Sequence, residues 1–132
     1  MTPEEAIKAT LEAISGLSAH VLPLEGLKNA VAPFIFYLRR QHQVEDSLSG
    51  VTELQSAEFE IHCVAKTYAS LIWLSGAARS ALLGLQGQTQ DGLTIEHITV
   101  QQASPDLRER EVDLYRRAYT LRMNYQEEVS HE

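Results

Sequence analysis

The chain has 132 residues, with 18 acidic and 11 basic side chains and a formal net charge of −7. This length, with a hydrophobic content of 44%, indicates one globular domain that has a core of its own. The negative charge argues against a protein whose main task is to grip nucleic acid or anionic lipid, because both ligands require a basic surface.

The N-terminal segment, residues 3–15, is predicted to be a helix. Thr2 and Glu5 form a capping box at its start, with Pro3 at the first helical position. Gly16 is expected to end the helix in a left-handed conformation. Two shorter segments are predicted next: a strand at residues 21–22 and a loop over residues 24–32.

A long hairpin of two strands follows. The first strand, residues 34–44, begins with apolar side chains on both faces, so this end is expected to be covered on both sides. Residues 45–50 are polar and form the predicted tip. In the second strand, residues 57–65, apolar side chains alternate with polar ones, which predicts one packed face and one solvent-facing face.

A second helix is predicted to start after Thr67, its expected N-cap, and to end between Gly84 and Gly87. Its core stripe follows the helical spacing of apolar residues: Leu71, Leu74, Ala78, Leu82 and Leu85. The polar, glycine-bearing residues 86–92 are predicted to be a loop.

The C-terminal third is predicted to add two strands. In the first, the apolar phase shifts near residues 96–97, which predicts a β-bulge. Residues 103–111 are charged and contain Pro105, so a loop is expected there. The last strand places Tyr119, Leu121, Met123 and Tyr125 on one face, and Arg116, Ala118, Thr120, Arg122 and Asn124 on the other.

This order of elements predicts an α+β fold, in which a mostly antiparallel sheet with a long hairpin carries two helices on one face. Residues 1–126 are expected to form this single domain, and residues 127–132 a loose polar C-terminal tail. Neither a secretory signal nor an apolar stretch long enough to cross a membrane is recognised, so synthesis in the cytoplasm is expected.

The sequence predicts no metal, no cofactor and no catalytic centre. Cys63 is the only cysteine, and it falls in the apolar phase of its strand. It adjoins His62, so the two side chains point to opposite faces; this favours a core residue over a metal ligand or nucleophile. The His and Cys spacings typical of metal sites are missing, and the acidic residues are scattered.

The basic residues concentrate at Arg116, Arg117 and Arg122. Arg116 and Arg122 share a strand face. Opposite Glu58 and Glu60 they would form ordinary cross-strand pairs, and the alternative is a stripe that binds a partner.

The second helix carries apolar residues outside its core stripe. Ile72 and Trp73 lie beside or beyond that stripe, with Tyr68 near Ile72, and residues 67–78 hold no charge. A surface helix of a monomer usually places charges there. Either the helix is buried on most sides, or these three side chains contact another subunit. We favour the subunit contact.

Four segments, through their order and spacing, resemble the tail-completion proteins of long-tailed bacteriophages and prophages. They are Pro33–Tyr37, Ala57–Ala69, the end of the alanine-rich helix at Ala81–Leu83, and Asp113–Arg117. The resemblance spans roughly residues 17–126. The helix departs from the charge-rich form of the family through Ile72, Trp73 and Gly76.

The resemblance implies a structural virion protein and not an enzyme. Such α+β subunits cap or complete the tail tube at its head-proximal end and join it to the head, and related tail terminators form rings of six. The implied partners are further copies of the chain, tail-tube proteins and head–tail connector proteins. The implied location is the neck of a virion, where DNA passes through without tight binding and no membrane is involved.

Two loops are expected to order against these partners. Their candidate contact residues are Glu45, Asp46 and Leu48 in the hairpin tip, and Asp106, Arg108 and Arg110 in the charged loop. The alternative function is a small α+β enzyme or ligand-binding domain, which requires polar groups that converge between the sheet and the helices. A regulatory interaction module would differ from the first function only in its partner.

Overall fold

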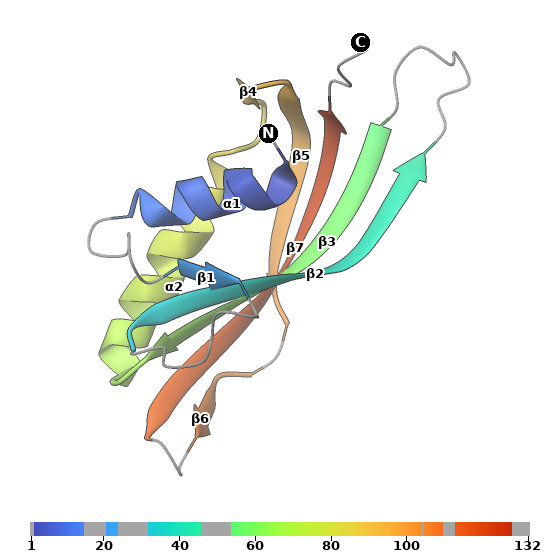
Figure 1. Cartoon of the computed structure of the whole chain (residues 1–132). Coiled ribbons are helices and arrows are strands. Elements are labelled where there is room, and N and C mark those ends of the chain that lie inside the picture. Colours follow the sequence, from blue (N-terminus) through green and yellow to red (C-terminus); the bar gives the residue numbers. More distant parts are fainter. Residues whose placement is uncertain are drawn as a thin grey trace.

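Two helices lie against one face of a long, bowed sheet (Figure 1). The computed structural model describes residues 2–14, 21–23, 32–45, 54–103, 105–109 and 113–127. The elements in chain order are α1 (Pro3–Glu12), β1 (Val21–Pro23), β2 (Phe34–Glu45), β3 (Leu54–Ala65), α2 (Tyr68–Leu83), β4 (Thr89–Gln90), β5 (Leu93–Gln102), β6 (Leu107–Glu109) and β7 (Leu114–Glu127).

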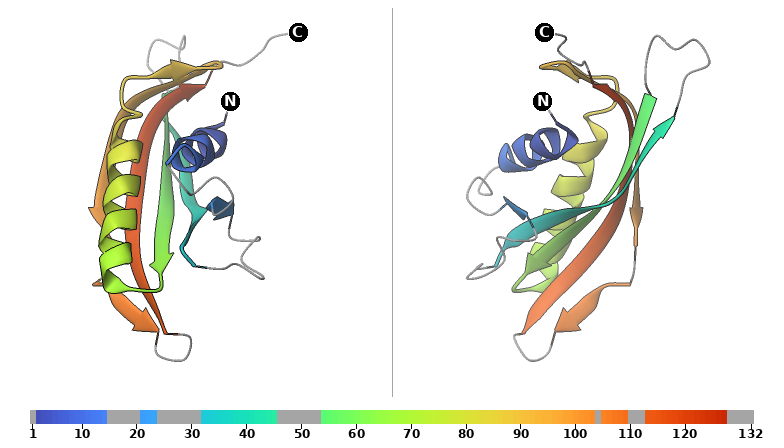
Figure 2. Two further views of the ribbon diagram at one scale, coloured as in Figure 1. Left: turned by 90° about the vertical axis from the view of Figure 1, so that its left-hand side faces the viewer. Right: turned by 45° about the vertical axis from the view of Figure 1, so that its right-hand side comes forward.

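The strand order in the seven-stranded sheet is β1-β2-β3-β7-β5-β4, and β6 pairs with β7 beside this path. β1 runs parallel to β2, and the other strand pairs are antiparallel. Figure 2 shows both helices on the same side of this sheet. The predicted α+β class, with a mostly antiparallel sheet and two helices on one face, is confirmed.

The core lies between the helices and the sheet. Ile7 and Leu11 of α1, and Leu71 and Leu74 of α2, are completely or almost completely buried. They pack against the alternate residues of β3 that the sequence assigned to the packed face: Ala57, Phe59, Ile61, Cys63 and Ala65. Each large aliphatic side chain buried in this way contributes about 1.5–3 kcal/mol.

A second, smaller apolar cluster lies on the opposite face of the sheet. It contains Phe34, Phe36 and Val64, together with Ala32. The first strand of the hairpin is therefore buried on both faces at its start, as predicted. The phase shift in β5 is also confirmed, because the β5–β7 register slips between Ile95 and His97.

Both helix starts agree with the sequence. The Thr2 hydroxyl accepts a hydrogen bond from the Glu5 backbone N–H, and the Thr67 hydroxyl accepts one from that of Ser70. The predicted end of the first helix is wrong. The helix stops at Glu12, because the Ile14 N–H bonds to the Leu11 carbonyl and tightens the last turn.

Two predicted loops contain short strands. β4 lies within residues 86–92, where Asp91 and Gly92 both adopt positive φ values of 48° and 81°. This is the backbone of a two-residue hairpin turn, for which Asp-Gly is a preferred sequence. β6 lies within residues 103–111 and pairs with the first residues of β7. These pairings satisfy backbone groups that an open loop would leave to water.

The remaining expectations concern residues at or beyond the ends of the described segments. β7 continues to Glu127, one residue into the predicted tail. Gly16, residues 24–31 of the predicted loop, 46–50 of the hairpin tip and 128–132 of the tail lie outside the described residues. In the described part of the chain, no helix is both long and apolar enough to cross a membrane.

Candidate functional site

Three large apolar side chains stand exposed on the outer face of α2, and we call them the α2 ridge. Tyr68, Ile72 and Trp73 are 45%, 49% and 57% exposed. The inward face of the same helix is buried through Leu71, Leu74, Ser75, Ala78 and Leu82. Of the two sequence-based alternatives for this helix, burial on most sides within one chain is thus excluded.

The helix surface one turn beyond Trp73 carries no side chain. Gly76 lies one turn further along the helix on the same side, and a Cβ atom built there would meet nothing within 4 Å. A side chain at this position would therefore point into open space. Among the described residues, one other large apolar side chain is exposed, that of Leu107 on β6.

A polar cluster around Asp106 anchors the first turn of α2. Arg117 of β7 donates two hydrogen bonds to the Asp106 carboxylate, each 2.7 Å long, from Nε and Nη2. The Tyr68 hydroxyl donates a third at 2.8 Å, and the Gln102 side chain a fourth at 3.2 Å. Arg117 also donates to the hydroxyl of the buried Ser75 at 3.0 Å. The cluster thus ties the β5–β6 connection to α2 and β7.

The charges of this cluster neutralise one another. Hydrogen bonds from Arg117 lower the pKa of Asp106, and hydrogen bonds to Asp106 raise the pKa of Arg117. Hydrogen bonding to the same carboxylate raises the pKa of Tyr68, because the phenol must keep its proton to donate. Asp106 is therefore an ionised carboxylate that is held by internal donors.

Ring contacts connect the α2 ridge to β7 and β6. The rings of Tyr68 and Tyr115 meet edge to face, with centroids 5.9 Å apart. The Arg108 guanidinium lies 5.7 Å from the centre of the Tyr115 ring, and its Nη2 is 3.0 Å from the Asp113 carboxylate. Tyr68, Tyr115 and Arg108 therefore connect the helix surface to the edge of the sheet.

The structure brings some predicted site residues together and separates others. Tyr68, Asp106 and Arg108 lie in one neighbourhood, with Ile72 and Trp73 on the next turn of α2. Glu45 is the last residue of β2, paired with Leu54, at the far end of the sheet. Asp46, Leu48 and Arg110 lie outside the described residues.

Sequence reasoning missed the part of Arg117 and Ser75 in this cluster. A signal for Arg117 was present: it falls in the same alternating phase as Tyr115 and Tyr119, which face the helices. A charged residue in an apolar phase indicates an internal ion pair. Ser75 left no such signal, since a serine next to a core stripe is common on any helix.

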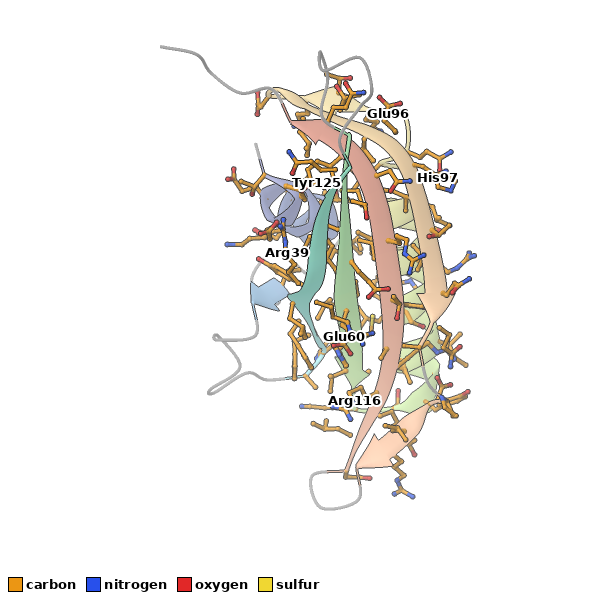
Figure 3. All side chains as sticks on the ribbon, turned by 90° about the vertical axis from the view of Figure 1, so that its right-hand side faces the viewer. Arg39, Glu60, Glu96, His97, Arg116 and Tyr125 are labelled. Carbon is orange, nitrogen blue, oxygen red and sulfur yellow. The ribbon has the colours of Figure 1, made fainter. Side chains whose placement is uncertain are left out.

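The other face of the sheet carries a ladder of charges. Arg122 lies opposite Glu58 and is 3.3 Å from its carboxylate, which confirms one expected cross-strand pair. Arg116 lies opposite Val64 instead of a glutamate. The expected cross-strand pair between Arg116 and Glu60 is wrong, because the strand register places Glu60 opposite Thr120. Figure 3 shows Glu60 and Arg116 in the same lower part of the sheet.

His62 and Cys63 hold the positions expected from their alternation. The His62 ring stacks on Phe36 with centroids 4.4 Å apart, and burial lowers its pKa. Cys63 is fully buried on the helix side, and burial raises the pKa of its thiol to about 12. Such a thiol is a core residue and a poor nucleophile at neutral pH.

The space between the sheet and the helices, where the alternative function would need a site, is filled with apolar side chains. Gln55 and Ser75 are the buried polar side chains of the described residues, and both have hydrogen-bond partners there. Within the described ranges, no three His, Cys, Asp or Glu side chains gather closely enough to hold a metal ion.

No family model and no curated protein matches this sequence. Among solved structures, the chain is similar to a chain of the "Virion of native gene transfer agent (GTA) particle". The TM-score is 0.55, the identity is 17%, and the alignment covers 94% of each chain. The two chains therefore share a fold over nearly their whole length.

Proposed function

We propose that this chain is a structural subunit of a phage-like particle. In this role it completes or caps the tail tube at its head-proximal end and helps to join the tail to the head. The observation that carries the proposal is the shared fold with a virion component over 94% of both chains. The resemblance of the sequence to tail-completion proteins supports the specific position in the particle.

The subunit would act as part of a ring of six. A ring requires a contact between two different surfaces of neighbouring copies, related by a rotation that closes. The α2 ridge has the composition of such a contact, because Trp and Tyr are enriched among the few residues that supply most of the binding energy at protein interfaces. The tail-tube and connector proteins would bind at the ends of the sheet.

DNA would pass through this ring without being held. The chain carries a net charge of −7, and like charge keeps a polyphosphate from adhering to a protein wall. The particle's neck is the expected location, and other copies and virion proteins are the expected partners.

The native mass of the purified protein over a concentration series, with electron micrographs of large species, tests the proposal. We expect six-fold rings. The variant Trp73→Asp should remain a folded monomer, because it places a charge in the contact. Gln101→Glu adds the same charge on an exposed position of β5 and should form rings as the wild type does.

Two results would count against the proposal in different ways. Intact rings of Trp73→Asp would show that the α2 ridge is not part of the contact between subunits, while the proposed ring itself would stand. A wild-type chain that neither assembles alone nor binds to the ends of purified tail tubes would refute the structural role.

A further inference from the structure

The outer edge of β5, on the side away from β7, carries backbone groups that no described residue binds. The Ile98 N–H points to this edge, because it donates to the Gln86 side chain at 3.1 Å. The Ala103 N–H points to the other side and donates to the Ala118 carbonyl of β7. Backbone groups alternate in direction along an antiparallel strand, so the N–H and C=O of Val100 face the outer edge. Among the described residues, neither group of Val100 has a hydrogen-bond partner.

This edge carries neither charge nor proline, which are the residues that commonly protect a strand edge from pairing. The sequence from Ile98 to Ala103 contains no charged residue and no proline. The backbone of β4 and of the two residues before it pairs with β5 only from Leu93 to Ile95. Beyond that point, no strand of the described segments lies outside β5. An edge of this kind accepts an extended segment as one further strand.

α2 runs along the same edge. At the start of the helix, the Tyr68 hydroxyl donates to Asp106, to which Gln102 at the end of β5 also donates. Just after the end of the helix, Gln86 accepts the hydrogen bond from the edge of β5. Ile72 lies one turn after Tyr68 on the same side of the helix and is 49% exposed. A strand added beside β5 would therefore lie next to the exposed Ile72 side chain.

The opposite edge of the sheet is open in the same rows. β1 pairs with β2 only as far as Tyr37, and no described strand continues this pairing. Leu38, the next residue of β2, shares a row across β3 and β7 with Gln101 of β5. In the same way, His42 shares a row with Ile98. Figure 3 shows β2 and β5 toward the two sides of the sheet, so its two open edges lie at the same height.

We propose that the outer edge of β5 in one copy pairs with the open edge of β2 in a second copy, as an antiparallel continuation of the sheet. This inference deepens the proposed function and rests on it. Three antiparallel pairings separate β2 from β5, so the two strands run in opposite directions. A second copy placed beside the first by a rotation therefore presents β2 antiparallel to β5. The two edges are different surfaces, and such a heterologous contact can close a ring.

The simplest competitor is β5 paired with itself across a two-fold axis. That contact is isologous, so it ends at a dimer and leaves the β2 edge of each copy open. An open strand edge is a template for aggregation. The contact between β5 and β2 uses both edges of every copy once the ring closes, and this favours it over the two-fold dimer.

Cross-linking at exposed strand positions distinguishes the two contacts. Thr99 on β5 and Arg40 on β2 are both exposed, whereas the natural Cys63 is buried. We expect a short bismaleimide to join Thr99→Cys chains to Arg40→Cys chains in a mixture, and neither variant to itself. A mixture of Thr99→Cys with Lys8→Cys, an exposed position on α1, should stay unlinked. Links between two Thr99→Cys chains, or none in the first mixture although rings form, would overturn the proposal.

Loss of one backbone donor tests the strand pairing itself. Val100→Pro removes an N–H that β7 does not use, and proline is tolerated on an edge strand where the N–H faces outward. Val100→Ala shortens the same side chain and keeps the N–H. Sedimentation velocity over a concentration series measures the concentration of half-assembly. This concentration should rise about tenfold or more for the proline variant and stay within about threefold of wild type for the alanine variant.

The failure of this contact and the failure of the ring give different results. Rings that form equally well from a folded Val100→Pro chain and from wild type would overturn the strand pairing and leave the ring proposal standing. If circular dichroism shows that Val100→Pro is unfolded, the cross-links decide. A wild-type chain that is monomeric at every concentration, alone and with tail tubes, would overturn both. Gln101→Glu should still form rings, because it leaves the backbone groups of the edge unchanged.

Discussion

The inward and outward faces of α2 both carry large apolar side chains, yet only the inward face is covered. Leu71 and Leu74 are buried against the sheet, whereas Ile72 and Trp73, one residue away, are about half exposed. In most surface helices the outward face is charged, which keeps the monomer soluble. α2 therefore carries more apolar surface than its own chain covers, and the excess lies on its outward side.

The largest effect should come from the inward face. Leu74→Ala removes a side chain that is 1% exposed and should lower the free energy of unfolding by about 2–5 kcal/mol, through lost burial and a cavity. Trp73→Ala, at the adjacent position, should change it by less than about 0.5 kcal/mol. Denaturant unfolding of the two variants, at concentrations where the chain is monomeric, measures both. Equal losses would mean that Trp73 belongs to the core.

An intermediate effect is expected at Asp106, whose carboxylate joins Tyr68 of α2 to Arg117 of β7. Asp106→Asn leaves the Arg117 guanidinium without its carboxylate and should cost about 1 kcal/mol, since both side chains retain some solvent contact. Thermal unfolding measures this loss, and Gln101→Glu on the far face serves as the control. No loss at neutral pH would show that the cluster does not stabilise the monomer.

The same carboxylate predicts a pH dependence. The pKa of Asp106 is lowered in the fold, so its contribution is present above the ordinary range of an aspartate and is lost as the pH falls through the folded value. The difference in stability between wild type and Asp106→Asn should therefore shrink in acid. A difference that stays constant down to pH 2 would contradict the ion pair.

The smallest effect should come from the outward face itself. Gly76 is exposed in the middle of α2, and a Cβ atom has open space there. Gly76→Ala should therefore raise the free energy of unfolding by about 0.5–1 kcal/mol, through a better helix propensity. If a neighbouring subunit packs closely against Gly76, the same variant should weaken assembly while it stabilises the monomer. Circular dichroism melts and sedimentation report the two quantities separately.

Much of the fold was predictable because burial leaves a regular trace in the sequence. The period-two pattern of residues 57–65 correctly assigned the packed face of β3, and the phase shift after Ile95 located the bulge. The short strands β4 and β6 escaped notice, since two or three residues show no period. The Asp91–Gly92 pair is a local signal for the turn that follows β4.

The candidate site was predictable only in part. The excess of apolar residues on α2 identified Tyr68, Ile72 and Trp73, because their spacing did not fit a single core stripe. The Asp106 cluster was not predictable, since the side-chain hydrogen bonds of Arg117 to Asp106 and Ser75 join residues 11 and 42 positions apart. Helical spacing also cannot distinguish a face that is covered by the same chain from one that is covered by a partner.

Cys63 lies fully buried on β3, one of the two central strands of the sheet, in the core that the sheet forms with the helices. A thiol reagent reaches such a position only when the sheet and the helices separate, so the rate of its modification follows opening of the whole domain. The rate of Cys63 modification therefore measures how often the domain opens. With Trp73 on the outer surface, a single molecule carries one reporter for its interior and another for its association with neighbours.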